Sequence, residues 1–340
     1  MDKQPKRRLL WQIPFLVILV VGTILIIRQQ QATPYQYCKG TIFGTTYSIS
    51  YQYDKDLRPQ IEARMMEVDS ALSMFNKQSI ISRINRNEPT ALNDMFIHVF
   101  QTAQQVSDDT QGAFDITVAP LVNAWGFGFQ NGEMPDQQDI DSLQQFIGYR
   151  KISFDGQKIQ KNDPRMMLDC SAIAKGYGVD IIARLLSEKG IENYMVEIGG
   201  EVATKGISEK RLPWKIGVTK PTDDPMAEQT ELQTVLNVTD KCMATSGNYR
   251  NYYYKGGRKY AHTIDPKTGR PVQHSILSAT VLSDHCALAD AYATAFMVMG
   301  LKGAKEVLKK HPELMAYLIY DDKGHNRVWF SPSLKDKIQE

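Results

Sequence analysis

The sequence predicts an α+β body of mixed sheets and packed helices, preceded by one N-terminal transmembrane helix. The chain has 340 residues, of which 42% are hydrophobic, so it can bury a sizeable core. One apolar run stands apart at the N-terminus, and the remaining residues show strand-like and helix-like patterns in no strict β-α-β order. That order favours segregated strands and helices over a doubly wound sheet.

The N-terminal segment reads as a membrane anchor. Residues 1–8 form a basic cytoplasmic tail, 9–27 are about long enough to cross the hydrocarbon of a bilayer, 28–38 form a polar linker, and the body occupies 39–335. The excess of Lys and Arg before the span predicts a cytoplasmic N-terminus. We therefore expect a single-pass protein of the bacterial inner membrane, with its body on the periplasmic side.

Two other readings of this segment stay open. A cleaved signal peptide would need a second small residue near Ala32, and a lipoprotein would need small residues before Cys38. The cysteines are scattered without a C-x-x-C pair, so buried free thiols are expected, although an exported body would permit one disulfide. They are Cys38, Cys170, Cys242 and Cys286.

The charge balance argues against a nucleic-acid partner. The chain has 40 basic and 38 acidic residues and a formal charge of +2. Nucleic-acid binding would need a local basic stripe, and the sequence has none beyond the N-terminus.

The first elements of the body follow from their periodicity. Residues 40–54 alternate and are rich in Thr, Tyr and Ile, which predicts a strand. Residues 57–75 and 93–112 are predicted to form amphipathic helices. A further helix is expected from a cap at Asp169 or Ser171 to Lys189.

Glycines mark two places where the backbone needs room. Gly176 and Gly178 lie inside a predicted helix, where each costs about 1 kcal/mol relative to alanine. Either tight packing against a strand or close approach of a ligand would explain them. Gly199 and Gly200 join two predicted strands, as a tight turn or as a place where backbone amides meet an anion.

Asp290 and Thr294 are the most informative pair in the sequence. They lie inside a predicted helix that begins after a cap at Ser283 or Asp284 and ends at Gly300. Because the pair is four residues apart, both side chains lie on one helical face. An aspartate among small apolar residues needs compensation, which a hard cation would provide. The alternative is that Asp290 pairs with a lysine while Thr294 bonds back to a carbonyl one turn earlier.

Seven segments between about Lys39 and Phe330 form a distinctive set. They are GTIFGTTYSI, AFDITVAPLVNAWGFG, LDCSAIAKGYGVD, EIGGEV, ATSGNYRNYY, HTIDPKTGRPV and ADAYATAFMVMG. Together, and in this order, they resemble the ApbE-type FAD:protein FMN transferases. The resemblance implies an ApbE-like, two-lobed α+β body.

The resemblance implies an activity. Enzymes of this family use Mg²⁺ and FAD, transfer FMN onto a threonine or serine of a target protein, and release AMP. Their targets are typically flavoprotein subunits of membrane redox complexes, such as the Na⁺-pumping NADH:quinone reductase and Rnf-type complexes. A Mg²⁺-dependent FAD pyrophosphatase, which gives FMN and AMP with water as the acceptor, is the alternative that residues alone barely separate.

The family's roles map onto residues of this chain. Asp290 and Thr294 correspond to side-chain Mg²⁺ ligands, and the carbonyl of Ala172 corresponds to a backbone ligand. We nominate His262 as the general base, because histidine titrates in the useful range and this one lies beside a flavin-contact motif. The implied FAD contacts are Phe43, Phe75, Ala113, Phe114, Asp115, Asp169, Lys175 and Ile264.

The chain departs from the family pattern at several positions. Phe43 stands where methionine is common, Phe75 where tyrosine is common, and Glu201 where a shorter polar residue is frequent. The run DCSAI replaces a glycine-containing one, which leaves the pocket shape beside Asp169 open. The glycines of AKGYG and EIGGE are expected to give the dinucleotide clearance.

Short motifs in the sequence also match two unrelated functions in part. S-G-N and K-T-G motifs are typical of penicillin-binding acyl-transferases, but no lysine follows a serine by three residues, as the S-x-x-K nucleophile motif requires. The run GFGFQNG at 126–132 only loosely matches a dinucleotide fingerprint, so a non-enzymatic electron carrier is weakly indicated.

Overall fold

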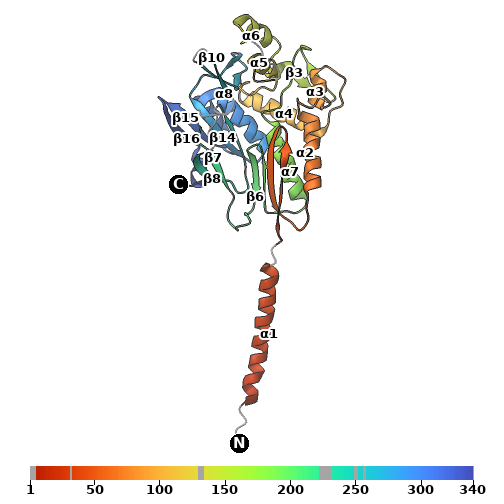
Figure 1. The fold of residues 1–340 in the computed structure, drawn as a ribbon, viewed down its shortest axis with the longest axis vertical. Helices are drawn as coiled ribbons and strands as arrows, with labels where there is room; N and C mark the ends of the chain where they lie inside the picture. The colour runs from red at the N-terminus through yellow and green to blue at the C-terminus, as the bar shows by residue number, and fades with distance from the viewer. Residues whose placement is uncertain are drawn as a thin grey trace.

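One antiparallel sheet of eight strands organises the body of the protein, as a computed structural model shows (Figure 1). The structure describes residues 5–30, 33–128, 134–221, 231–248, 252–255 and 258–339. Within these ranges, the side chains of 5–12, 26–30, 254–255 and 258–259 are not described.

The strands of this sheet run in the order β1-β2-β5-β6-β9-β14-β15-β16, and every neighbouring pair is antiparallel. The prediction of an α+β body is therefore confirmed. Strand β14 lies between β9 and β15, so that Thr280 faces Thr245 on one side and Tyr317 on the other. The strands are β1 (Tyr35–Ile42), β2 (Thr45–Gln52), β5 (Tyr194–Ile198), β6 (Glu201–Lys205), β9 (Cys242–Gly247), β14 (Ile276–Ser283), β15 (Met315–Asp322) and β16 (His325–Phe330).

The single strand predicted over 40–54 is wrong, because two strands meet there. β1 and β2 form a hairpin whose turn contains Phe43 and Gly44, both with positive φ, 52° and 73°. Phe43 fits the alternating pattern, so periodicity alone did not reveal the turn. Gly199 and Gly200, with φ of 63° and 100°, do form the predicted tight turn between β5 and β6.

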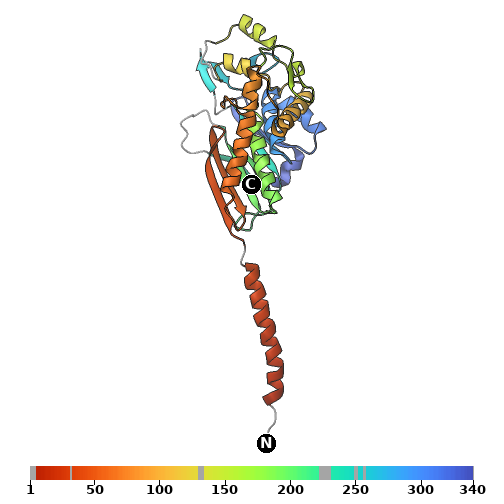
Figure 2. The ribbon, with the colours of Figure 1, turned by 90° about the vertical axis from the view of Figure 1, so that its right-hand side faces the viewer.

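Helices cover one face of the sheet in two layers. α7 packs against β5 and β6, α8 packs against β9 and β14, and α2 and α4 pack on the outer side of these two helices (Figures 1 and 2). The helices predicted over 57–75 and 93–112 are confirmed as α2 and α4. The four helices are α2 (Arg58–Leu72), α4 (Asp94–Asp109), α7 (Ala174–Glu188) and α8 (Cys286–Lys310).

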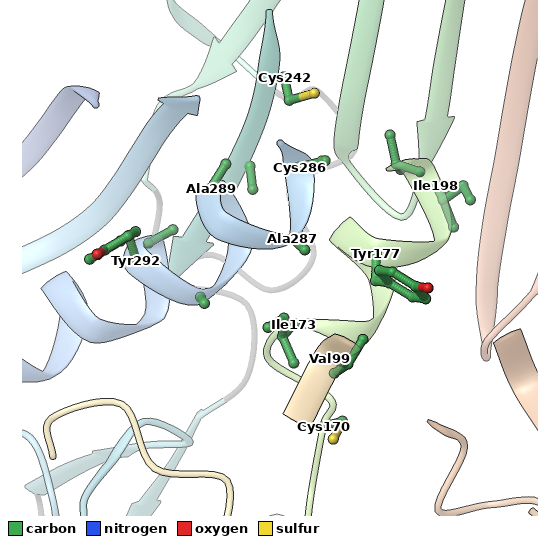
Figure 3. Packing of buried hydrophobic residues seen from close by; sticks show 14 of the residues in the cluster. Val99, Cys170, Ile173, Tyr177, Ile198, Cys242, Cys286, Ala287, Ala289 and Tyr292 are labelled. Atoms are coloured by element: carbon green, nitrogen blue, oxygen red, sulfur yellow. The ribbon is translucent and has the colours of Figure 1, made fainter. Parts of the chain in front are cut away.

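The contact between α7 and α8 is unusually close. A Cβ added to Gly176 in α7 would lie 2.4 Å from the carbonyl oxygen of Cys286 and 2.9 Å from the Cα of Ala287. Figure 3 shows the first turn of α8, with Cys286 and Ala287, between β9 and α7. Gly176 is therefore explained by helix packing, and the expectation that it clears a ligand is wrong.

The N-termini of both helices differ from the predicted caps. Asp180, in the middle of α7, accepts hydrogen bonds from the backbone N–H groups of Cys286 (2.7 Å) and Ala287 (2.9 Å). A carboxylate at this end complements the helix dipole of α8, and no capping side chain from Ser283 or Asp284 does so. α7 begins at Ala174 without a side-chain cap.

α8 continues past Gly300, where the sequence predicted its end. Gly300 has a φ of 72° and a ψ of 176°, which breaks the helix, yet helical backbone resumes as far as Lys310. The ring of His274 lies against this break, 3.5 Å from the position that a Cβ on Gly300 would take. The N–H of Ile276 donates to His274 Nδ1 at 3.2 Å.

The other face of the sheet is partly covered by a second, three-stranded sheet. Trp214, Val218 and Leu236 of this layer form a core with Leu282 and Ile319 of the large sheet. Its strands are β7 (Lys215–Thr219), β8 (Leu232–Asn237) and β17 (Ile338–Gln339), beside the 3₁₀ helix η2 (Pro332–Lys337).

A smaller lobe with its own core sits at the upper end of the body in Figure 1. Leu121, Trp125, Ile140 and Ile264 form its centre, and Trp125 Nε1 donates to the carbonyl of Gly269 at 2.8 Å. The short elements of the lobe and its surroundings are α3 (Ile80–Asn85), α5 (Ala119–Ala124), α6 (Gln137–Gln144), η1 (Tyr149–Lys151), β3 (Ile152–Phe154), β4 (Ile159–Lys161), β10 (Tyr252–Lys255), β11 (Arg258–Ala261), β12 (Ile264–Asp265) and β13 (Arg270–Pro271).

The N-terminal helix α1 (Pro5–Gln30) projects away from the body in both views (Figures 1 and 2). Taken over the described residues, the structure contains no helix with the length and apolar character needed to cross a membrane. The span predicted over 9–27 is thus not supported, and the side chains of 9–12, 26 and 27 lie outside the described part. The prediction of buried free thiols is confirmed, because all four cysteines are free and buried.

Replacing Gly176 with alanine is expected to destabilise the fold by about 1–3 kcal/mol, because the methyl group would meet only backbone atoms that cannot turn away. Urea unfolding measures the change. Gly178→Ala is the matched control in the same helix, since its methyl group would meet the Phe43 ring, which can shift. Equal stability of Gly176→Ala and the wild type would show that α7 and α8 do not depend on this close contact.

The stability of the chain is expected to fall in mild acid through His274. Burial lowers the pKa of His274 below its usual 6.5, so the unfolded chain binds the proton more readily and stability is lost as the pH falls below about 6.5. The free energy of unfolding should fall between pH of about 7.5 and about 5.5, and this fall should be larger for the wild type than for His274→Gln. An identical pH response of the two proteins would contradict this account.

Candidate active site

A cavity of about 450 Å³ lies where α7, α8 and the ends of β6 and β9 meet the small lobe. A cavity of this size is in the range of cofactor and substrate sites. Ten of the eleven residues implied by the family resemblance line it, and Phe43 does not. These ten are Phe75, Ala113, Phe114, Asp115, Asp169, Ala172, Lys175, Ile264, Asp290 and Thr294, and the nominated base His262 lines it as well.

Asp290 and Thr294 face the cavity from one side of α8, one turn apart, as the sequence predicted. Asp290 is 3% exposed, and its Oδ2 accepts a hydrogen bond from the backbone N–H of Gly176 at 3.1 Å. Burial raises the pKa of Asp290. The Thr294 hydroxyl lies 3.1 Å from the Ser246 hydroxyl of β9. Its hydrogen-bond partner is therefore on a neighbouring strand, and the alternative of a bond to the carbonyl one turn earlier in the helix is wrong.

Lys175 and Glu201 complete a charged cluster around Asp290. The Lys175 ammonium lies 2.5 Å from Glu201 Oε1 and 4.0 Å from Asp290 Oδ1. The alternative that Asp290 lies near a lysine is therefore partly correct. Burial and then Asp290 raise the pKa of Glu201 to about 7. Burial alone would lower the pKa of Lys175, but the two carboxylates together raise it.

Three residues that line the cavity carry oxygen atoms of the kind that bind magnesium. Asp290 has a carboxylate, Thr294 a hydroxyl and Ala172 a backbone carbonyl, and all three are hard ligands. Among the described residues no group of three or more His, Cys, Asp or Glu side chains could hold a metal. One carboxylate, one hydroxyl and one carbonyl would make part of a Mg²⁺ shell, and Mg²⁺ sites commonly take their remaining ligands from water and phosphate oxygens.

Asp115 and Asp169 shape the loops that line the cavity. Both Asp115 oxygens accept protein hydrogen bonds, from Thr117 N–H (2.8 Å) and hydroxyl (2.6 Å) and from Tyr149 N–H (2.8 Å). Burial raises the pKa of Asp115. Asp169 Oδ1 accepts from the N–H of Ser171 at 2.7 Å, which orders the turn before Ala172.

Aromatic and apolar side chains line the cavity on the side of the small lobe. His262 makes an edge-on contact with Phe127 at 6.4 Å between ring centroids, and Ile264 belongs to the core of this lobe. Phe75 is 78% exposed beside the opening. The cavity is therefore charged at the α7–α8 contact and apolar toward the small lobe.

Phe43 is the residue that the structure does not bring to the cavity. Its ring lies against Gly178, where an added Cβ would be 2.7 Å from Phe43 Cε2. Gly178 therefore makes room for Phe43, and the expectation that it clears a dinucleotide is wrong. Gly199 does line the cavity, beside the side chain of Lys175.

Sequence reasoning missed the contribution of β9. Thr245 and Ser246 line the cavity opposite α8, and Ser246 bonds to the proposed metal-binding threonine. Both residues lie at the end of a central strand, just before a glycine, and this position was the one sequence feature that could have indicated a place in the site. The importance of Glu201 was also missed, although its position after the double glycine had been noted.

Three comparisons with known proteins identify the family of this chain. The model of the ApbE family matches residues 43–319. FAD:protein FMN transferases of Vibrio cholerae and Escherichia coli K12 are 35% and 33% identical to this chain, over 91% and 89% of it and 94% and 89% of their own lengths. A solved structure of the flavin transferase ApbE from Vibrio cholerae matches with a TM-score of 0.81 at 34% identity, covering 89% of this chain and 99% of that one. The chain therefore belongs to the ApbE family.

Proposed function

We propose that this enzyme transfers FMN from FAD onto a threonine or serine side chain of a flavoprotein subunit and releases AMP. The observation that carries the proposal is the arrangement of Asp290 and Thr294 in a cavity that also holds a lysine and ends in an aromatic wall. Such a cavity suits a ligand with a diphosphate and flat rings. The names of the related proteins support the same reaction.

Asp290, Thr294 and the Ala172 carbonyl would hold Mg²⁺, which neutralises charge on the diphosphate when bound. In the reaction the acceptor hydroxyl oxygen forms a bond to the phosphorus of the FMN half. The bond from that phosphorus to the bridging oxygen breaks, and AMP leaves with the bonding electrons. Phosphoryl transfer depends mainly on positioning and charge.

His262 is proposed to take the proton of the acceptor hydroxyl. It lines the cavity on the side of the small lobe, across from the charged cluster of α7 and α8. Two of the proposed flavin contacts line the same cavity: Ile264 belongs to the core of the small lobe, and Phe75 is exposed. Phe43 would act only indirectly, through its packing on α7.

We also propose that α1 anchors the enzyme in the inner membrane, with its body on the periplasmic side. Large apolar side chains described between residues 13 and 25 are exposed, among them Phe15 and Ile18. Such a location would place the site near membrane redox complexes, and we propose a flavoprotein subunit of a Na⁺-pumping NADH:quinone reductase or Rnf-type complex as the acceptor.

Asp290→Asn is expected to abolish flavin transfer, because it removes the anionic ligand from the proposed Mg²⁺ site. The measurement is mass spectrometry of a purified acceptor subunit incubated with enzyme, FAD and Mg²⁺, where transfer adds one FMN moiety. Asp284→Asn, an exposed aspartate before the same helix, is the matched control. Full transfer by Asp290→Asn would remove the metal assignment, and free FMN with an unmodified acceptor would favour FAD hydrolysis instead.

His262→Ala is expected to slow transfer by about 10²–10⁴ without preventing FAD binding, since loss of a general base acts on the chemical step. Single-turnover release of AMP measures the rate, and quenching of flavin fluorescence measures binding. An unchanged rate would show that another group takes the proton.

The anchor is tested by separating membranes from soluble protein in cells that make the full chain. The wild type should sediment with membranes and resist a carbonate wash. A chain with Val17→Arg and Val21→Arg should be released, because each charge costs about 2.5–3.5 kcal/mol in a membrane-spanning helix. Wild-type protein found only in the soluble fraction would contradict this location.

A further inference from the structure

Lys175 is held between two carboxylates that differ from it in exposure. Its ammonium contacts Glu201 Oε1 at 2.5 Å and lies 4.0 Å from Asp290 Oδ1. The side chain of Lys175 is 31% exposed, whereas both carboxylate side chains are 4% exposed. The carboxylates are thus enclosed by packing, while the lysine lies at the cavity wall on a flexible stem.

The cluster lacks positive charge. Two carboxylates face one ammonium, and buried charges need partners. Glu201 Oε2 is buried and has no hydrogen-bond partner among the described residues, which is costly for a polar atom. A second cation at the cluster would remove this imbalance.

The two oxygens of Asp290 are not equivalent. Oδ2 accepts the N–H of Gly176, whereas Oδ1 is the oxygen nearer to the Lys175 ammonium. Oδ1 is thus the oxygen that remains for a divalent cation. A cation bound there would repel the ammonium, because like charges a few ångströms apart in a buried site interact strongly.

We propose that Lys175 is a built-in counter-ion for the metal site and that Glu201 draws it away from Asp290 when a divalent cation binds. Without the cation, the single ammonium lies between both carboxylates and neutralises only one of the two charges. With the cation on Oδ1, the ammonium pairs with Glu201 alone. This inference rests on the proposed function, because it takes Asp290 as a metal ligand.

The surrounding structure supports this division of roles. Glu201 begins β6 directly after the turn at Gly199 and Gly200, so the sheet holds its backbone in place. A Cβ on Gly199 would lie 3.3 Å from Lys175 Cδ, so the glycine leaves space beside the lysine stem. Lys175 and Glu201 are positioning residues on this account.

The test is the affinity for Mn²⁺, measured by electron paramagnetic resonance, alone and with FAD. Lys175→Met should bind Mn²⁺ more tightly by roughly tenfold or more, because the competing charge is gone. Glu201→Gln should bind it more weakly by roughly tenfold, because the ammonium then pairs only with Asp290. In the Lys175→Met background the Glu201→Gln change should have a much smaller effect, which a double-mutant cycle reports.

Matched controls come from an ion pair outside the cavity, between an exposed glutamate and a half-buried lysine of the same strand. Lys205 ends β6 and pairs with Glu192 at 3.0 Å. Lys205→Met and Glu192→Gln change the net charge equally but should leave the Mn²⁺ affinity unchanged. Thermal unfolding checks that each variant is folded, and Lys175→Gln, which removes the charge but keeps a hydrogen-bond donor, replaces Lys175→Met if that variant does not fold.

Weaker or unchanged Mn²⁺ binding by a folded variant without the Lys175 charge would overturn the inference. The inference would also be overturned if Glu201→Gln lowered the Mn²⁺ affinity by the same factor in the wild type and in the Lys175→Met variant. That result would mean that Glu201 acts on the metal independently of the lysine. These outcomes leave the proposed function standing. Absence of Mn²⁺ binding by the wild type, with and without FAD, would instead overturn the metal site itself and this inference with it.

Discussion

The close contact between α7 and α8 is the constraint on which the site depends. Gly176 lets the backbone of α7 touch the first turn of α8, and Asp180 of α7 caps that turn. Asp290 is buried in the same contact, where the N–H of Gly176 fixes one of its oxygens. Lys175 precedes Gly176 in the chain, so the position of its ammonium follows from the same packing.

The large sheet and the small lobe supply the other walls of the cavity. Strand β9 places Ser246 against Thr294, and the turn after β5 brings Glu201 to Lys175. The lobe adds His262 and an apolar wall. Charge at one end and apolar surface at the other match two features of a flavin dinucleotide, its polar diphosphate and its flat rings.

Periodicity and local chemistry predicted much of this architecture. The helices α2 and α4, the tight turn between β5 and β6, and the shared face of Asp290 and Thr294 are all set by neighbouring residues. The set of residues that line the cavity could be predicted only from the family resemblance, because these residues come from segments far apart in the chain.

The errors have a common physical cause. Gly176 and Gly178 were expected either to pack against a strand or to leave room for a ligand, but their partners are Cys286 and Phe43, more than a hundred residues away along the chain. The cap of α8 likewise comes from a different helix, and α8 continues past the break at Gly300, against which the ring of His274 lies. Such tertiary contacts leave no mark on local sequence pattern.

The most direct test of the account is anomalous diffraction from a crystal soaked with Mn²⁺ and FAD. The account predicts one strong manganese peak within coordination distance of Asp290 Oδ1, Thr294 Oγ1 and the Ala172 carbonyl, beside the diphosphate. A manganese peak elsewhere on the diphosphate, with Asp290 still turned toward Lys175, would contradict it.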